Sequence, residues 1–574
     1  MKRAQWFLVL TVILCIISLF LRQVSSPGAV GLFVADIVDF VLVAAVLIEL
    51  IYEIVCAKYI KIYVSDNLFS VLFALTFFAL FIYTKFFDSG FSSSWAIFAV
   101  LLKSVFSSLN AYSKQKKFSA YVERFSTNPA QSILMSFVMV ILMGTLLLMM
   151  KFTTLDGKGL SFLDAFFTAT SATCVTGLIV VDTATVYTIW GQLIILLLIQ
   201  IGGLGIMLLS FFTVVLLGRG ISLQGKMLLS YMLSEDDTSG LRSTVLNIVL
   251  TTLVIEGIGA VCLFLGFVPT LGFSLRNLYV SVFHSISAFC NAGFSLYSNS
   301  IENFRLNPIV TFTIAFLIIL GGIGFSVINN IGAVIKDKFK KYIKKEKTGH
   351  SPEITLNSRI ALSFTGILLL AGTLLFYILE YNNSMSEYGL GEQYLAAFFQ
   401  SVTLRTAGFN SVPFANLRPS TYILMFMFMF IGASSGGTAG GIKVGTISVM
   451  LASTRAFLKG EKDVCIGKFQ ISAEKVRSAF VIFFSGLFVA FFAIFLLSLT
   501  EKHNLLETTF EIFSAIGTVG LSTGITPLLS SLGKIIIILL MFWGRVGAIT
   551  ILSAAAFKTE KVNINWPQAN ISIG

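Results

Sequence analysis

The chain has 574 residues, of which 56% are hydrophobic and only 12% are charged. This charged share is about half of the ~25% usual in soluble domains, and apolar runs of about 20 residues, the length that crosses a bilayer as a helix, recur along the chain. These features exclude a soluble protein and predict an integral membrane protein. The net charge of +12 does not indicate nucleic-acid binding, because the basic residues cluster in loops between apolar runs, as membrane topology requires.

Residues 1–125 are expected to form an N-terminal block of about four transmembrane helices. The first apolar run follows Lys2 and Arg3, as in a signal peptide, but no small-residue cleavage pattern follows it, so we interpret it as a retained span. A voltage sensor would need several basic residues at three-residue spacing in one helix, and the fourth segment offers only Lys103. A structural or oligomerisation role is therefore favoured for this block. Its apolar segments lie near 5–22, 29–52, 66–87 and 94–108.

The rest of the chain contains a fourfold repeat. A short segment of apolar and small residues ends on a glycine and is followed by polar residues and a long apolar run. The four glycines are separated by 116, 115 and 112 residues, and a phenylalanine stands ten residues before each of them. Spacing this regular predicts four internal repeats. The glycines are Gly177, Gly293, Gly408 and Gly520, and the phenylalanines are Phe167, Phe283, Phe398 and Phe510.

Each repeat reads as an apolar helix, a short re-entrant segment with the glycine, and a second apolar helix. The fold class is therefore an all-α polytopic membrane protein with four such units in a pseudo-fourfold arrangement, preceded by the N-terminal helices. We expect the units at 126–235, 236–350, 351–465 and 466–574. The first helices are expected near 131–150, 243–268, 360–381 and 478–500, and the second helices near 187–217, 307–335, 421–455 and 533–557.

The connections between units are basic. Seven lysines stand between residues 335 and 347, and six basic residues lie between 455 and 477. The positive-inside rule places these connections in the cytoplasm. The glycine segments then enter the membrane from the outer face.

The glycine segments have the properties of an ion filter. A segment such as 167–172 is too short to span the membrane and must turn back, so its helix C-terminus and the residues after it face the membrane interior, where helix dipole and carbonyl oxygens favour a cation. Glycine permits backbone angles that aim successive carbonyls inward, and four such segments around one axis would form the carbonyl rings of potassium-selective filters. The predicted filter comprises Thr173, Cys174, Val175, Thr176, Gly177, Phe289, Cys290, Asn291, Ala292, Gly293, Leu404, Arg405, Thr406, Ala407, Gly408, Ile516, Gly517, Thr518, Val519 and Gly520. The backbone carbonyls expected to bind potassium are those of Thr176, Gly177, Ala292, Gly293, Ala407, Gly408, Val519 and Gly520.

A glycine-rich stretch interrupts the second helix of the third unit. Five of the ten residues from Gly432 to Gly441 are glycine and three are serine or threonine, so a regular helix is not expected there. We predict a flexible loop beneath the filter that acts as a gate. In the other second helices, glycines near the midpoint are expected to permit bends or a close approach to the filter. The predicted gate residues are Gly432, Ser434, Ser435, Gly436, Gly437, Thr438, Gly440 and Gly441 in this stretch, Lys443 just after it, and Arg545 in the last apolar helix.

Three charged residues near the filter carry separate hypotheses. Arg545, in the last apolar helix, is expected to line the cavity below the filter and to pair with backbone carbonyls of the gate loop, while a structural role away from the pore is the alternative. Arg405 is expected to point behind the filter, with Glu511 as its candidate partner. Asp182 either attracts cations at the outer mouth or is simply solvated, and the sequence does not favour one of these over the other.

The sequence gives no indication of an enzyme. The six cysteines and three histidines lack metal-ligand spacing, and no catalytic set of nucleophile, base and orienting residue is apparent.

At this point a family resemblance becomes visible. The motifs T-C-V-T-G-L, F-C-N-A-G-F, L-R-T-A-G-F and G-T-V-G-L-S-T-G resemble the four filter motifs of the Trk/Ktr/HKT superfamily of potassium transporters. The stretch G-A-S-S-G-G-T-A-G-G-I-K, which ends at Lys443, resembles the intramembrane gating loop of that family, and G-R-V-G resembles the arginine segment of its final helix. The resemblance extends from about residue 126 to the end of the last helix.

The resemblance implies a potassium-translocating, multi-pass subunit of the cell inner (cytoplasmic) membrane. It also implies a homodimer and a cytoplasmic ring of RCK-type regulatory subunits that bind ATP/ADP or NAD. No G-x-x-x-x-G-K-[ST] phosphate loop occurs in the sequence, so no nucleotide is expected to bind this chain itself. The lysine-rich loops suit either docking of that ring or anionic membrane lipids. In the family, serine at the first filter position accompanies sodium permeation, so Gly177 favours potassium.

Two departures from the family pattern stand out: the N-terminal block exceeds the minimal core, and Cys290 replaces a small polar residue. Three function classes remain open: a potassium channel gated by a cytosolic partner, a sodium- or proton-coupled potassium symporter, and a sensor or scaffold. The first is the leading interpretation.

Overall fold

The computed structural model describes residues 129–205, 241–344, 352–414 and 417–555, together with a few positions between 37 and 48. The expected N-terminal block, apart from those positions, lies outside the described residues. So do residues 206–217, where the second helix of the first unit was expected to continue.

Four units follow one another, each with a long helix, a short helix and a further helix. The first unit has α7 (Pro129–Leu148), α8 (Phe162–Thr173) and α9 (Ile189–Leu204). The second has α12 (Leu241–Leu271), α13 (Leu275–Phe289), α14 (Pro308–Ile323) and α15 (Phe325–Lys344). The third has α16 (Leu356–Glu380), α17 (Leu390–Thr403), α18 (Pro419–Phe430) and α19 (Val444–Lys459). The fourth has α20 (Ala473–Thr500), α21 (Leu505–Gly517), α22 (Ser531–Val546) and α23 (Ala548–Ala555).

Short 3-10 turns lie in the connections of three units, at η1 (Lys151–Thr153), η3 (Glu302–Phe304) and η5 (Thr526–Leu528). An antiparallel pair, β1 (Cys465–Ile466) and β2 (Phe469–Gln470), connects units three and four.

Composition and length mark several helices as membrane spans. Within the described residues, three helices are long and apolar enough to cross a bilayer, or up to five if each bent pair is counted as one span. The three are Leu246–Leu271, Leu356–Glu380 and Ala473–Thr500. Large apolar side chains cover the outward faces of these helices, for example Phe488 and Leu370, as expected for contact with lipid rather than water.

The short helices begin at defined caps and end at the glycine segments. Ser161 caps α8 by accepting from the backbone N–H of Asp164, and Ser274 caps α13 by accepting from that of Asn277. In α21 the Asn504 side chain and Glu507 form a capping box. These caps satisfy N–H groups that the first helical turn leaves without partners. They fix where each short helix starts, and hence where its C-terminus points.

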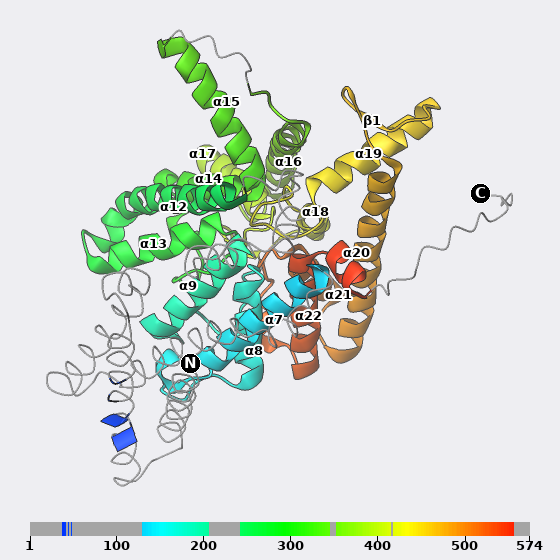
Figure 1. Ribbon diagram of the computed structural model, residues 1–574. Helices are drawn as coiled ribbons and strands as arrows, with labels where there is room; N and C mark the ends of the chain where they lie inside the picture. Colours follow the sequence, from blue (N-terminus) through cyan, green and yellow to red (C-terminus); the bar gives the residue numbers. More distant parts are fainter. Residues whose placement is uncertain are drawn as a thin grey trace.

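The four units close into a ring (Figure 1). The third helix of each unit packs against the short helix of the next: α9 on α13, α14 on α17, α18 on α21, and α22 back on α8. Each long first helix packs against the short helix of its own unit. The ring therefore surrounds the short helices with the longer ones.

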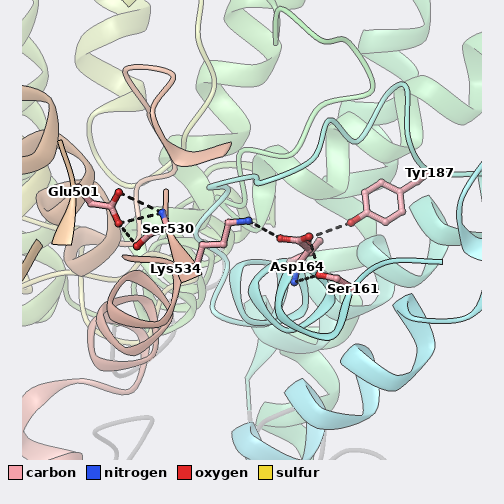
Figure 2. Close-up of polar contacts among 7 residues, drawn as sticks. Ser161, Asp164, Tyr187, Glu501, Ser530 and Lys534 are labelled. Atoms are coloured by element: carbon pink, nitrogen blue, oxygen red, sulfur yellow. Dashed lines mark hydrogen bonds and ion pairs between the residues drawn. The ribbon is translucent and has the colours of Figure 1, made fainter. Parts of the chain in front are cut away.

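An ion pair joins the last unit to the first (Figure 2). Lys534 Nζ at the start of α22 lies 2.7 Å from Asp164 Oδ1 at the start of α8, and both side chains are partly buried. Nearby, Glu501 at the end of α20 accepts from the hydroxyl and backbone N–H of Ser530, the N-cap of α22. The ion pair thus crosses the seam where the ring closes, and the Glu501 contacts fix the start of α22 that carries Lys534.

Glycines bend two of the third helices and a loop interrupts another. α14 and α15 meet at 100° around Gly324, and α22 and α23 meet at 97° around Gly547. Both glycines have φ in the left-handed region, at +99° and +87°, which residues with a Cβ rarely adopt. Between α18 and α19 the helix is broken over residues 431–443, as its glycine content predicts. After its bend, α15 extends away from the ring (Figure 1).

Candidate functional site

The four repeat glycines lie together at the centre of the ring, each beside the next. A Cβ placed on Gly177 would lie 3.2 Å from Gly293 Cα, and one on Gly293 would lie 2.9 Å from Gly408 Cα. A Cβ on Gly408 would lie 3.3 Å from Gly520 Cα, and one on Gly520 would lie 2.9 Å from Gly177 Cα. The contacts run around the ring in chain order and return to the first glycine. Segments more than 100 residues apart thus converge on one point, and no side chain larger than hydrogen fits there.

A backbone carbonyl accompanies each of these contacts. The oxygen of Ala292 lies against Gly177, that of Ala407 against Gly293, that of Val519 against Gly408, and that of Thr176 against Gly520. These are the four equivalent residues that directly precede the glycines. Their oxygens therefore surround the same point as the glycines.

The backbone of all four segments has the same unusual conformation. In the part of the chain that the structure describes, five non-glycine residues have positive φ, and four of them stand two residues before the repeat glycines. Such angles are uncommon outside glycine and cluster at functional sites. The four residues are Val175, Asn291, Thr406 and Thr518, and all are buried.

Hydroxyl groups on the short helices fix these segments in two ways. In units one and four, Ser171 Oγ accepts from the N–H of Gly177, and Ser514 Oγ accepts from the N–H of Gly520, both at 3.1 Å. In unit two, Ser287 Oγ instead donates to a carbonyl just past the glycine, that of Phe294, at 2.7 Å. These serines stand six residues before their glycines.

The third segment departs from the other three. Val402 occupies the position of those serines, and the adjacent Thr403 donates from Oγ1 to the carbonyl of Phe409 at 2.7 Å. The N–H of Ala407 bonds the carbonyl of Thr403, one residue later than in the other units. Phe398 is only partly buried, whereas the equivalent phenylalanines are fully buried. All four units therefore keep the glycine, but the hydrogen bonds that hold the glycine segment differ between units.

The side chain of Arg405, three residues before Gly408, points away from the centre towards α16. Arg405 is buried and donates from Nη2 to Thr365 Oγ1 of α16 at 3.1 Å. Its position behind the segment agrees with the expectation, but the partner expected for it was wrong. Glu511 instead accepts from Ser522 Oγ, the N–H of Thr523 and Thr526 Oγ1.

The 431–443 loop lies against the glycine segments and the bend of unit two. Thr438 donates from its N–H to the carbonyl of Gly321 at 3.1 Å and from Oγ1 to the carbonyl of Phe289 at 3.1 Å. Ser434 donates to the carbonyl of Gly322, and the carbonyl of Gly436 accepts from the N–H of Phe325. Phe289 is the first residue of the second predicted filter segment, so the loop contacts that segment directly.

Two partly buried cations hold the loop. Arg545 donates to the carbonyls of Thr438 in the loop and of Gly202 and Gly203 in α9. Lys443 Nζ donates to the loop carbonyls of Ala439 at 2.5 Å and Gly440 at 3.1 Å. The expected pairing of Arg545 with loop carbonyls is confirmed. Each positive charge is matched with carbonyl dipoles, which compensate a cation at this depth.

Glycines of the third helices let those helices approach the same segments. A Cβ on Gly202 would lie 3.1 Å from Thr173 Cα, one on Gly321 would lie 3.0 Å from the carbonyl carbon of Phe289, and one on Gly544 would lie 2.9 Å from that of Ile516. The expected close approach is confirmed for these three glycines.

The loops outside the glycine segments are connected by polar contacts. Asp182 accepts from Thr185 Oγ1 and from Ser298 Oγ of the next unit, both in exposed contacts. Glu302 accepts from Asn410 Nδ2 of the third unit at 2.8 Å. Partial burial raises the pKa of Glu302, and the charge of Arg305 opposes that shift. Carboxylates thus join consecutive units at this end of the ring.

Residues 92–565 match the TrkH family, described as cation transport proteins. The chain belongs to the TrkH family. This match begins ahead of the start near residue 126 that the motifs suggested.

Three relatives of this TrkH-family chain are similar over most of their length. Ktr system potassium uptake protein B of Bacillus subtilis is 40% identical, over 78% of this chain and 97% of the relative. The protein of the same name from Vibrio alginolyticus is 40% identical, over 77% and 94%. Potassium/sodium uptake protein NtpJ of Enterococcus hirae is 37% identical, over 78% and 97%.

A solved structure shares the fold. The crystal structure of the potassium transporter TrkH from Vibrio parahaemolyticus aligns with a TM-score of 0.59 over 86% of this chain and 98% of that one, at 18% identity. Together with the apolar helices, the family places this chain among multi-pass proteins of the cell membrane, and its relatives are ion transporters rather than enzymes.

Some residues of the site had no place in the sequence-based prediction. The serines at the sixth position before the glycine bond the glycine segments. Their recurrence in three of four units was the available signal. Gln200 and Glu256, which contact Cys290, gave a weaker signal, since only their polarity within apolar helices distinguishes them.

Proposed function

We propose that this TrkH-family chain takes up potassium across the cell membrane, through a selectivity filter built from the backbone of the four glycine segments. The observation that carries the proposal is the closed ring of Gly177, Gly293, Gly408 and Gly520 with four equivalent carbonyls beside them. Carbonyl oxygens arranged around an axis can replace the water shell of a dehydrated potassium ion. The relatives named as potassium uptake proteins support the same cargo.

The 431–443 loop is proposed as the gate of this path. It lies against the second filter segment through Thr438 and Phe289, and Arg545 ties it to α9. A loop held by a few hydrogen bonds can be displaced at moderate cost, since each is worth on the order of 1 kcal/mol, or up to ~3 kcal/mol when charged. Its displacement would break its contacts with the second filter segment and with Arg545.

The chain is further proposed to work as a homodimer with a cytosolic ring of nucleotide-binding subunits. The family resemblance supports this, and the basic helix α15, with Lys336, Lys338 and Lys341, extends from the ring where such a partner could bind. Potassium is the cargo, and this chain itself binds no nucleotide.

The proposal is tested by potassium uptake in a bacterial strain that lacks its own uptake systems, with and without a candidate regulatory subunit. The wild-type chain should restore uptake. Gly177→Asp and Gly408→Asp should abolish it, because a Cβ at either site meets a neighbouring carbonyl. Undiminished uptake with both variants would favour a sensor or scaffold instead.

A coupled symporter on the same fold is the second candidate, and the observation that favours it is the relative named as a potassium/sodium uptake protein. Reversal potentials in reconstituted membranes separate the two. Coupling predicts a shift of the reversal potential with the sodium or proton gradient, and a channel predicts dependence on the permeant ion alone.

A further inference from the structure

A carboxyl group is buried inside α12 close to the second glycine segment. Glu256 lies within the apolar span Leu246–Leu271 and is only 5% exposed. Ionisable side chains at membrane depth are costly, and they usually mark functional positions. Among the residues that the structure describes, no lysine or arginine forms an ion pair with Glu256. Its presence is therefore not explained by charge pairing within these residues.

The carboxyl group is instead bound by two polar side chains from different units. Gln200 of α9 donates from Nε2 to Glu256 Oε2 at 3.2 Å. The thiol of Cys290 lies 3.6 Å from Gln200 Oε1 and 3.9 Å from Glu256 Oε1, so its S–H faces both acceptors. Cys290 is fully buried and stands three residues before Gly293. The three side chains form one network behind the second glycine segment.

The backbone around this network is closely packed. A Cβ on Gly203 would lie 2.6 Å from Cys290 Sγ, so α9 can lie this close to the thiol only because the residue there is glycine. On the other side, Ser285 Oγ donates to the backbone carbonyl of Glu256 at 2.6 Å, and a Cβ on Gly259 would lie 2.6 Å from that hydroxyl. The thiol is thus in close contact with α9, and α13 is bonded to the backbone of α12 at Glu256.

A carboxyl group at this place is not a general feature of the repeat. In the third unit Ser401 Oγ donates to the carbonyl of Leu369, as Ser285 Oγ donates to that of Glu256 in the second, so Leu369 occupies the equivalent position. An apolar side chain therefore takes the place of Glu256 in the third unit. Since burying an apolar residue avoids the cost of a polar one, packing alone does not call for glutamate here.

We infer that Glu256, together with Gln200, is a positioning residue for ion selectivity, which fixes the second filter segment by hydrogen bonds to Cys290. This inference rests on the proposed potassium filter. Discrimination between ions needs groups held to within about 0.5 Å, and a supporting network of hydrogen bonds provides such restraint. The network acts on the residue next to Phe289, whose carbonyl bonds Thr438 of the 431–443 loop. The second segment is thereby held by α12 on one side and by the loop on the other.

The test compares initial uptake rates of potassium and sodium in the uptake-deficient strain, at equal amounts of chain in the membrane. Glu256→Leu should lower the potassium-to-sodium ratio by about fivefold, the size of one lost hydrogen bond of ~1 kcal/mol. Glu256→Gln, which can still accept from Gln200, should keep the ratio. Ile258→Ala, on the exposed face of the same helix, is the matched control and should leave both rates unchanged.

Cys290→Ala is the second variant, because it removes the thiol with little change in volume and does not depend on Glu256→Leu reaching the membrane. It should lower the ratio as well, and the double variant should be no worse than the stronger single one, as expected for one shared contact. An unchanged ratio in Cys290→Ala overturns the inference, as does an equal loss in Glu256→Gln and Glu256→Leu. Failure of the proposed function is distinct, because wild-type cells would then show no potassium uptake at all.

Discussion

Arg545 donates a hydrogen bond to the carbonyl of Thr438, so that the last unit of the ring holds the loop of the third unit. The same guanidinium group donates to Gly202 and Gly203 of the first unit. One side chain therefore connects three of the four units directly beneath the glycine segments. Because α22 bends by 97° at Gly547, only two residues further on, a rotation at the bend would act on this contact.

Replacing Arg545 by alanine should raise basal potassium flux by about tenfold or more, because a hydrogen bond to a charged group contributes ~1.5–3 kcal/mol and 1.4 kcal/mol corresponds to a factor of ten. Flux is measured in reconstituted vesicles without a regulatory partner. Arg545→Lys keeps the charge but not the forked geometry and should fall between alanine and wild type. A variant with wild-type flux would assign Arg545 a purely structural role.

Thr438→Val tests a single contact of the loop. The substitution keeps the side-chain shape and removes the hydroxyl that donates to Phe289. Basal flux should rise by about fivefold, corresponding to ~1 kcal/mol. Thr454→Val is the matched control, since that exposed hydroxyl bonds only Met450 of its own helix. Equal flux in the two variants would contradict a gating role for this bond.

Shortening the loop by deletion within residues 433–440 should raise basal flux further, because it removes the contacts of Ser434, Gly436 and Thr438 with unit two together. Unchanged or reduced flux, with normal amounts of protein in the membrane, would count against the loop as the gate. Lys443 lies just outside the deleted residues, and its Nζ donates to the carbonyls of Ala439 and Gly440 at their end. As an internal check, Lys443→Met alone should raise basal flux less than the deletion does.

Local chemistry explains which features the sequence could predict. Glycine spacing and the short apolar segments revealed four units, and the glycine content between 432 and 441 predicted the break between α18 and α19, because both depend on backbone freedom within a few residues. The contact of Arg545 with the loop was predictable for a similar reason, since a cation at membrane depth requires carbonyl partners. In each case a physical requirement of a few neighbouring residues can be met by only a few structures.

Other features depend on packing between distant units. Glu511 was the expected partner of Arg405, but the nearby hydroxyls of Ser522 and Thr526 already satisfy it. Arg405 instead meets Thr365, whose polarity is unremarkable in a sequence. Choosing among several polar residues requires their positions in space, and a one-dimensional repeat does not provide them. The same holds for Glu256, whose network joins two units.

Serine at Gly177 should lower the preference for potassium over sodium. Gly177 has φ of +95°, and a Cβ there would lie 2.5 Å from Ala292 O, so the first segment must shift relative to the second. Permeability ratios are measured from reversal potentials in reconstituted vesicles. Gly157→Ser is the control, because Gly157 also has positive φ, at +65°, but open space around it. Unchanged ratios in Gly177→Ser would argue against the assigned filter.

The seam between the last and first units should contribute measurably to stability. Lys534 and Asp164 are 2.7 Å apart with side-chain exposures of 16% and 26%, so the pair is partly shielded from water. Asp164→Asn should lower the thermal midpoint of the detergent-solubilised protein, by an amount equivalent to roughly 1 kcal/mol, the upper part of the range for partly exposed pairs. Lys459→Ala is the comparison, because its pair with Glu461 is 3.9 Å long and half exposed, and it should leave the midpoint unchanged. A double variant of Lys534 and Asp164 should be no less stable than either single variant. Full additivity of the two single effects would show that the two residues act independently rather than as an ion pair.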